Sequence, residues 1–345
     1  MRGSISRVGP LRVGIFFLLL IVIPLVGAPG WILNTLIFTI MYAALASSWN
    51  LIGGYAGYPS LGHVAFFGIG AYAIGIVFSK DVFGGYVPFF ALPLIGIAVG
   101  LLSLPIGWVS IRTRADVIAI VTITLLFITQ TLAFNLKGVT GGAQGTSVAP
   151  PPFAVDHYDW PFYFAMLILL AIAMGISFYF QRSKIGLSLA TIRADEDKAH
   201  GVGVRVTAVK LIAFGVSASL VAMAGGVWAY YVGFIYPQFA VDPLITIGMV
   251  LMAFLGGRAT LWGPVLGAFI LVPAQEYFAQ AFGASQLYLF AYAAVFLLII
   301  LFLPRGILPS ISERLRQRRP VIVAEEAFAG EESTSGPAME VTVER

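Results

Sequence analysis

The sequence predicts an all-α fold, a polytopic bundle of about ten membrane-spanning helices (range 8–10), some of them broken. Hydrophobic residues make up 59% of the chain and charged residues only 10%, and the mean hydropathy is +0.93, values far from those of a soluble domain. From Val13 to Ser79 there is no Asp, Glu, Lys or Arg, each of which would cost roughly 2.5–3.5 kcal/mol at the centre of a spanning helix. The third observation is a cluster of glycines with a proline inside the apolar run at 50–72.

Segments of about 20 apolar residues can cross a hydrocarbon layer of roughly 30 Å. The candidate spans are 13–28, 32–52, 60–78, 88–109, 116–134, 161–181, 209–231, 243–256, 262–279 and 287–303. The first of them could instead be a signal peptide, because arginines precede it and Val26-Gly27-Ala28 resembles a signal-peptidase site. Pro29 would follow the cut, and we expect a retained span.

The basic residues predict the orientation. When alternate segments are assigned to the side of the N-terminus, that side receives nearly all arginines and lysines, and the opposite loops keep only Lys80 and Lys137. Since basic loops stay in the cytoplasm, we expect both termini to be cytoplasmic. The expected organisation is a cytoplasmic N-terminal segment (1–12), a transmembrane domain (13–308) and a largely disordered cytoplasmic tail (309–345) that is acidic after Pro320.

The sequence disfavours several classes of function. The chain has no cysteine, and its three histidines are far apart, so we expect no metal site and no cofactor. The G-x-x-x-x-G-K-[ST] phosphate-binding motif is absent, so we expect no ATP hydrolysis by this chain and no enzyme. A proton- or sodium-coupled carrier would place acids in mid-span, whereas only Glu276 lies well inside a candidate span, near one end. The net charge of +4 follows the membrane topology and does not predict a nucleic-acid partner.

The stretch "NLIGGYAGYPSLGHVAFFGIGAY" at 50–72 predicts a broken helix. Gly53-Gly54 and Pro59 interrupt the helix at bilayer depth, where irregular backbone is tolerated only against protein or a water-filled cavity. Ser60 then resembles the N-cap of a restarted helix that carries His63. We favour a break that lines a pathway; the alternative is that the glycines only allow close packing and the histidine is structural. The expected pathway residues are Gly53, Gly54, Tyr55, Pro59, Ser60 and His63.

A weaker echo occurs in "FLGGRATLWGPVLGAFI" at 254–270, which also has a glycine pair, a short polar interval and a renewed apolar run. Two breaks in separate halves suggest an internal structural repeat. The alternative is close helix packing, as in the GxxxG pairs Gly96/Gly100 and Gly263/Gly267. For this stretch we favour neither interpretation over the other.

The segment "QRSKIGLSLATIRADEDKAHGVGVRVTAVKL" at 181–211 lies between two strong spans and holds six basic and three acidic residues from Arg182 to Lys210. Leu187 through Ala199 predicts one short amphipathic helix that ends near Gly201 and Gly203. Its charges suit a docking surface for a cytoplasmic protein. The alternative is a helix that lies on the lipid surface.

Several motifs in order resemble those of a known family. Residues 54–72 closely resemble the "GYxGxxSLGHxxFFGIGAY" signature of permeases in branched-chain amino acid ABC transporters, and 182–204 resembles that family's coupling segment, "RSxxGRxxxAIRxxExxAxxxGI". Further matches are Thr140 to Gly145, "GGRATLWGPVLGA" at 256–268 and Pro304-Arg305-Gly306. The resemblance covers roughly 30–308 and suits the LivM-type subunit better than the LivH type. Pro59 and the run at 258–260 depart from the family's pattern.

The resemblance implies an ABC importer permease fold of the branched-chain amino acid/ribose permease group, in the bacterial or archaeal inner membrane. It implies a second, LivH-type permease, two ATPase subunits and an extracytoplasmic binding protein that supplies Leu, Ile or Val. Closure of the ATPases would push on the helix at 187–200 and switch the pathway from outward- to inward-facing. The expected coupling residues are Gly186, Arg193, Asp195, Glu196, Ala199 and Gly203. A permease for urea or short amides, and less so a stand-alone secondary carrier or a passive channel, remain alternatives.

Overall fold

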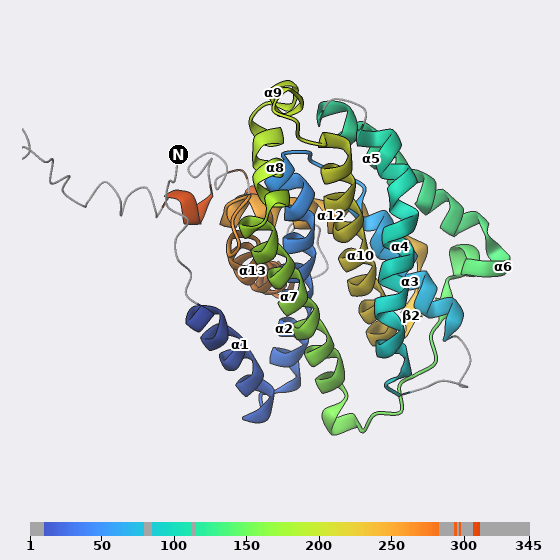
Figure 1. The fold of residues 1–345 in the computed structure, drawn as a ribbon. Coiled ribbons are helices and arrows are strands. Elements are labelled where there is room, and N and C mark those ends of the chain that lie inside the picture. The colour runs from blue at the N-terminus through green and yellow to red at the C-terminus, as the bar shows by residue number, and fades with distance from the viewer. Residues whose placement is uncertain are drawn as a thin grey trace, which may run out of the picture.

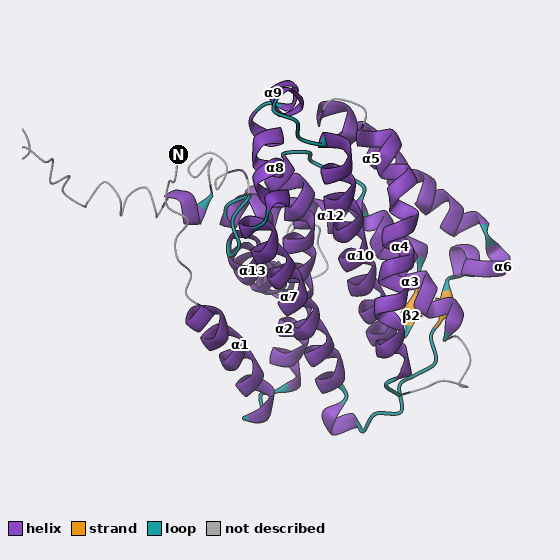
Figure 2. Ribbon diagram, in the orientation of Figure 1, coloured by secondary structure: helices purple, strands orange, loops and turns teal. Residues whose placement is uncertain are grey.

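The computed structural model describes residues 10–78, 85–111, 115–282, 293–294, 297 and 306–310. The described chain is a bundle of long helices with a two-stranded ribbon at its edge (Figure 1), and helix accounts for nearly all of its ordered backbone (Figure 2). The all-α prediction is therefore confirmed.

Within the described ranges, ten helices have more than ten residues: α1 (Pro10–Leu25), α2 (Gly30–Asn50), α3 (His63–Val77), α4 (Val87–Ile111), α5 (Ala115–Asn135), α7 (Asp159–Arg182), α8 (Lys184–Ala194), α10 (Val206–Val232), α12 (Pro243–Gly256) and α13 (Gly263–Phe282). Short helices are α6 (Lys137–Thr140), α9 (Glu196–Gly201) and α11 (Pro237–Ala240), with a π-helix η1 (Leu51–Ala56) and the 3₁₀ turns η3 (Gly142–Gln144) and η4 (Val155–His157). The strands β1 (Thr146–Ser147) and β2 (Phe234–Ile235) pair antiparallel, with Thr146 opposite Ile235.

Six helical stretches in the described part of the chain are long and apolar enough to cross a membrane: 30–56, 87–110, 117–135, 159–182, 206–232 and 237–256. Two shorter apolar helices occupy 12–25 and 63–77. The chain is thus multi-pass. The tenth expected span, at 287–303, lies almost wholly outside the described residues, as do nearly all of 1–12 and 309–345, so the total of about ten spans stays a prediction.

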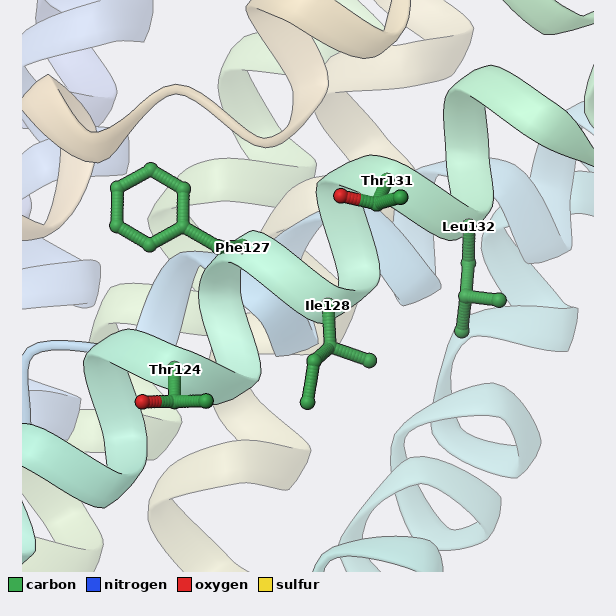
Figure 3. Close-up of a pocket in the computed structure, with 5 residues that line it drawn as sticks. All are labelled: Thr124, Phe127, Ile128, Thr131 and Leu132. Carbon is green, nitrogen blue, oxygen red and sulfur yellow. The ribbon is translucent and has the colours of Figure 1, made fainter.

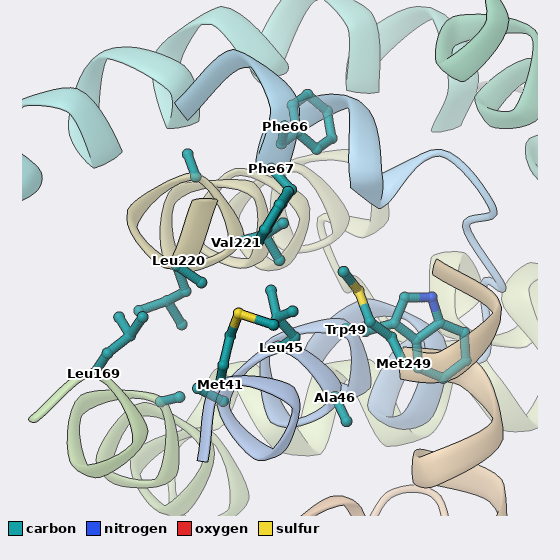
Figure 4. Close-up of a cluster of buried hydrophobic side chains, with 14 of the residues drawn as sticks. Met41, Leu45, Ala46, Trp49, Phe66, Phe67, Leu169, Leu220, Val221 and Met249 are labelled. Carbon is teal, nitrogen blue, oxygen red and sulfur yellow. The ribbon is translucent and has the colours of Figure 1, made fainter. Parts of the chain in front are cut away.

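Helix α2 is the centre of the core. Its side chains Met41, Leu45 and Trp49 pack among residues of α10, α12, α7 and α3, as Figure 4 shows. All three are nearly inaccessible to solvent. Because lipid is as apolar as these side chains, such helices associate through close packing and hydrogen bonds rather than through removal of apolar surface from water.

Close packing is most evident where α10 crosses α3 and α4. A Cβ atom at Gly225 would overlap the backbone of Phe67, and one at Gly70 would overlap the backbone of Ala222. Where α4 meets α10, a Cβ at Gly100 would lie 3.0 Å from the carbonyl oxygen of Gly215. The packing interpretation of the glycines is therefore confirmed on α4, and these glycines let α10 lie directly against both neighbours.

Helix α1 is packed into the bundle. The Tyr163 hydroxyl of α7 donates to the carbonyl oxygen of Leu20 at 2.8 Å. The ring of Phe16 meets those of Trp262 and Phe269 with centroids 5.1 and 5.6 Å apart. The helix expected over 13–28 is therefore part of the described bundle.

We expect Gly225→Val to destabilise the bundle, because a branched side chain would force α10 away from the backbone of Phe67. Overpacking of this kind costs about 1–3 kcal/mol. Thermal unfolding of the detergent-solubilised protein measures the effect. Gly175→Val on α7, where a Cβ meets nothing within 4 Å, is the matched control. Equal midpoints for the two variants would contradict the close α3–α10 crossing.

Candidate functional site

The predicted interruption after α2 is present. The helix widens into the π-helix η1, and Gly57 ends it in the left-handed conformation, with φ of 80° and its N–H bonded to the carbonyl oxygen of Ile52. No side chain fits at Gly54, because a Cβ there would overlap the side-chain amide of Asn50. The chain then runs without regular structure to His63, where α3 begins. We call residues 51–62 the first break.

The prediction that Ser60 caps α3 is wrong. The N-cap is Gly62, without a side-chain cap bond, because neighbouring helices supply the acceptors. Thr246 of α12 accepts from the N–H of Val64 at 2.9 Å, and Thr122 of α5 accepts from the N–H of Leu61 at 3.0 Å. A side chain of α12 therefore accepts from the first turn of α3, and one of α5 accepts from the chain just before it.

His63 is fully buried and uses both ring nitrogens. Its Nδ1 lies 2.7 Å from Ser60 Oγ and its Nε2 lies 2.8 Å from Ser217 Oγ of α10. The Ser217 hydroxyl donates to the carbonyl oxygen of Ser48 at 2.6 Å, so it accepts from the Nε2–H of His63, and a neutral ring then accepts from Ser60 through Nδ1. His63 thus joins the first break to α2 and α10.

Asn50 joins the first break to a second one. Its Oδ1 accepts from the N–H of Ala259 at 2.9 Å, and its Nδ2 donates to the carbonyl oxygen of Thr260 at 3.0 Å. Residues 257–262, which we call the second break, separate α12 from α13, and Ala259 has a positive φ of 60°. The two interruptions lie side by side although about two hundred residues separate them in the chain.

The expected single helix over 187–199 is wrong. The segment 183–205 forms two helices, α8 and α9, divided at Asp195, whose φ of −168° and ψ of 114° are extended. The Asp195 carboxylate accepts from the N–H of Lys198 at 3.0 Å and so caps α9. This local bond replaces helix continuation. Both helices lie together at one end of the bundle (Figure 1), and we call them the coupling segment.

Arg193 connects α8 to the first break. Its Nη1 donates to the carbonyl oxygen of Gly54 at 3.1 Å, and its methylene stem lies over Gly57, where a Cβ would be 2.7 Å from Arg193 Cγ. Burial, and then the neighbouring charge of Arg258, lower the pKa of Arg193. At the end of α7, Gln181 also donates to the hydroxyl of Tyr55 at 2.8 Å.

Glu196 connects α9 to the first break and to α10. Its Oε1 accepts from Lys210 Nζ, and its Oε2 accepts from the Tyr58 hydroxyl. Lys210 Nζ also donates to the Tyr58 hydroxyl at 2.6 Å and lies 3.8 Å from the centroid of that ring. Partial burial alone would raise the pKa of Glu196, but the hydrogen bonds from Lys210 and Tyr58 outweigh it and place the pKa below its ordinary value. The sequence analysis missed both Lys210 and Tyr58.

The other residues predicted from the sequence set the packing around the contacts of Arg193 and Glu196 or lie buried in the first break. Gly186 lets α8 fold back on α7, because a Cβ there would overlap the carbonyl oxygen of Phe180. Ala199 is buried, and Gly203 has a φ of 82° in the turn after α9. Of the expected pathway residues, Gly53, Gly54, Tyr55, Ser60 and His63 are buried, and Pro59 is partly exposed. The structure therefore brings the two predicted groups together as one connected site.

Within the described ranges, no group of three or more His, Cys, Asp or Glu residues is placed to hold a metal ion. A pocket drawn in Figure 3 lies on the outer face of α5 and is lined by Thr124, Phe127, Ile128, Thr131 and Leu132. All five residues belong to one helix, so this pocket is an open hollow at the bundle surface and not an internal chamber.

Comparisons with known proteins place these features in context. The family described as "Branched-chain amino acid transport system / permease component" matches residues 31–303. The high-affinity branched-chain amino acid transport system permease proteins LivM of Salmonella typhimurium and Escherichia coli are each 26% identical over 318 residues, 84% of this chain and 72% of theirs. A probable permease protein LivH of Methanocaldococcus jannaschii is 25% identical over 63% of this chain and 71% of its own length. No solved structure gives a significant match.

We expect Asn50→Ala to destabilise the fold, because it leaves the N–H of Ala259 and the carbonyl of Thr260 without their shared partner. An orphaned buried polar group costs about 1–3 kcal/mol. The readout is the thermal unfolding midpoint in detergent. Asn135→Ala removes an exposed asparagine that bonds only to its own helix, and it should change little. A midpoint for Asn50→Ala as high as that of the control would argue against the joining of the two breaks.

Proposed function

The chain belongs to the family of permease components of branched-chain amino acid transport systems, and we propose that it is the membrane-spanning subunit of an ATP-driven importer of branched-chain amino acids. It is a multi-pass protein of the inner membrane and not an enzyme. Its relatives named LivM carry that substrate class in their names, and the same class is the proposal for this chain.

One observation carries the proposal: the coupling segment is attached to the first break by Arg193 and Glu196. A folded helix pair outside the spans is unnecessary in a stand-alone carrier or a channel. In an ATP-driven importer it supplies a surface on which ATPases bear. The contacts with Gly54 and Tyr58 then carry a displacement of that surface into the membrane.

The partners follow from the family and from the motifs that the chain lacks. Two ATPase subunits hydrolyse ATP, because this sequence has no phosphate-binding motif of its own. A second permease of the LivH type completes the pathway, and an extracytoplasmic binding protein delivers the substrate. Both termini and the coupling segment lie in the cytoplasm, as the distribution of basic residues favours, with about ten spans in the domain 13–308.

The pathway runs between the two permeases, beside the first break. In this chain Tyr55, Ser60 and His63 are packed inside the protein, which supports a route that opens only when the break moves. Pro59 keeps part of its surface accessible. Gly53 and Gly54 permit the irregular backbone on which the movement depends.

The ATPases dock on the coupling segment. Arg193 is exposed, and Glu196 keeps a third of its side-chain surface accessible, while both reach the first break. A partner that touches either residue therefore acts on the break as well. Asp195 fixes the angle between α8 and α9 by capping α9, and Gly186, Ala199 and Gly203 allow the close turns that present both helices.

We expect ATP-dependent uptake of radiolabelled leucine in vesicles that contain this chain with its second permease, ATPases and binding protein, and no uptake when any component is left out. Urea is the competing substrate, since a permease for short amides shares the architecture. Uptake of urea without leucine would replace the proposed substrate. Uptake by this chain alone under an ion gradient would refute the importer.

We expect Arg193→Glu to weaken association with the ATPases and to lower uptake, because the reversed charge loses the bond to Gly54 and changes the docking surface. Co-purification of the ATPases and uptake per assembled transporter are the measurements. Lys137→Glu, which reverses an exposed charge on α6, serves as the control. Wild-type association and uptake in Arg193→Glu would exclude this residue from coupling.

A further inference from the structure

Lys210 is a fully buried cation at the beginning of a spanning helix. Its side chain has no accessible surface, and Glu196 is the partner that balances its charge. The three groups close a triangle: Lys210 donates to Glu196 and to Tyr58, and Tyr58 donates to the second oxygen of Glu196. The triangle joins three elements that are separate along the chain: α10, α9 and the first break.

The position of Lys210 on α10 links the triangle to the start of α3. Ser217 follows seven residues later, which is nearly two full helical turns, so both side chains lie on one face of α10. Ser217 bonds His63, and Lys210 bonds Tyr58. One face of one helix thus contacts both the second half of the first break and the first residue of α3.

The buried charge makes separation of α9 from α10 costly. Removing Glu196 from Lys210 would leave an ammonium group without a counter-charge in an apolar surrounding, which proteins avoid. If α9 moves, it must therefore either carry Lys210 and Tyr58 with it or expose the ammonium group of Lys210 to water. The Lys210–Glu196 ion pair would hold the coupling segment in a fixed position relative to the first break, a role for which buried ion pairs are suited.

We propose that Lys210 is a positioning residue that, through Glu196 and Tyr58, makes the first break follow the coupling segment when the ATPases move it. The inference rests on the proposed function, because it needs ATPases that bear on α8 and α9. It assigns Lys210 no contact with substrate. Loss of the triangle should uncouple ATP hydrolysis from uptake while the transporter still assembles.

The test uses the complete transporter in proteoliposomes, with uptake, ATP hydrolysis and ATPase association measured on each preparation. Lys210→Met, at a residue without accessible side-chain surface, should lower uptake per ATP hydrolysed about tenfold, within the range typical of coupling between sites, at unchanged association. Glu196→Gln lies on the docking surface, so uptake and ATP hydrolysis are both counted per assembled transporter, and their ratio should fall by the same factor. The double variant removes both charges together and leaves none uncompensated. It should fold at least as well as either single variant and remain uncoupled. Lys184→Met, an exposed lysine of α8, is the matched control and should keep the wild-type ratio.

A second readout follows the break directly. The chain has no cysteine, so a cysteine placed at the partly exposed Leu61 can be labelled with a thiol reagent without background. The labelling rate should change when the ATPases are trapped with ATP, and Lys210→Met should abolish that change. An equal change in both backgrounds, or none in the wild type, overturns the inference. Two further results also overturn the inference. One is uptake per ATP hydrolysed in Lys210→Met equal to that of the wild type. The other is a loss of uptake in the single and double variants that is proportional to the loss of assembled transporter. If leucine uptake fails in the wild type while labelling still responds to ATP, the proposed substrate fails and the linkage stands on the labelling result.

Discussion

The structure depends on one constraint: backbone N–H and C=O groups inside a membrane must find partners in the protein, because lipid offers none. A continuous helix satisfies them by itself, but an interrupted helix does not. Side chains of neighbouring elements meet this constraint. Thr122, Trp49 and Arg193 bond the backbone of the first break, Thr246 bonds Val64 at the start of α3, and Asn50 bonds the backbone of the second break. An interruption of this kind is stable only while those neighbours stay in place. The conformation of the first break therefore depends on the positions of the helices around it.

This dependence explains why the site is compact although its members are scattered in sequence. Asn50 bonds the backbone of the second break. Ser217 and Lys210 connect α10 to His63 and Tyr58. Arg193 and Glu196 connect the coupling segment to the first break. Helix α10 can approach so closely because glycines remove the side chains where it crosses α3 and α4. Close helix crossings and polar contacts thus reinforce each other, and a shift of any one of these helices alters the partners of the break.

The features predicted correctly from the sequence are those that depend on residues close together in the chain. Apolar runs located nine of the ten expected spans as helices, and the pair Gly53-Gly54 with Pro59 located the first break. Local reasoning failed where a distant residue supplied the partner. Ser60 has the chemistry of an N-cap, but Thr246 takes that role for α3 and leaves Ser60 to His63. The helix expected at 187–199 is divided because the Asp195 carboxylate caps α9. The helical periodicity of the sequence does not predict this hydrogen bond.

Lys210 shows the limit of sequence reasoning most clearly. A lysine near the end of an apolar run ordinarily extends its stem along the helix and keeps its charge in water, and nothing nearby in the sequence says otherwise. Its partner Tyr58 lies 152 residues earlier, and its counter-charge, Glu196, belongs to a segment that looks solvated. Only the folded chain places all three together. A lysine that could have reached water is instead enclosed between a helix outside the membrane and a broken one within it, at a desolvation cost that a purely structural contact with apolar side chains would have avoided. Under the proposed function, the ion pair keeps the coupling segment and the first break in a fixed relative position while the ATPases move the coupling segment.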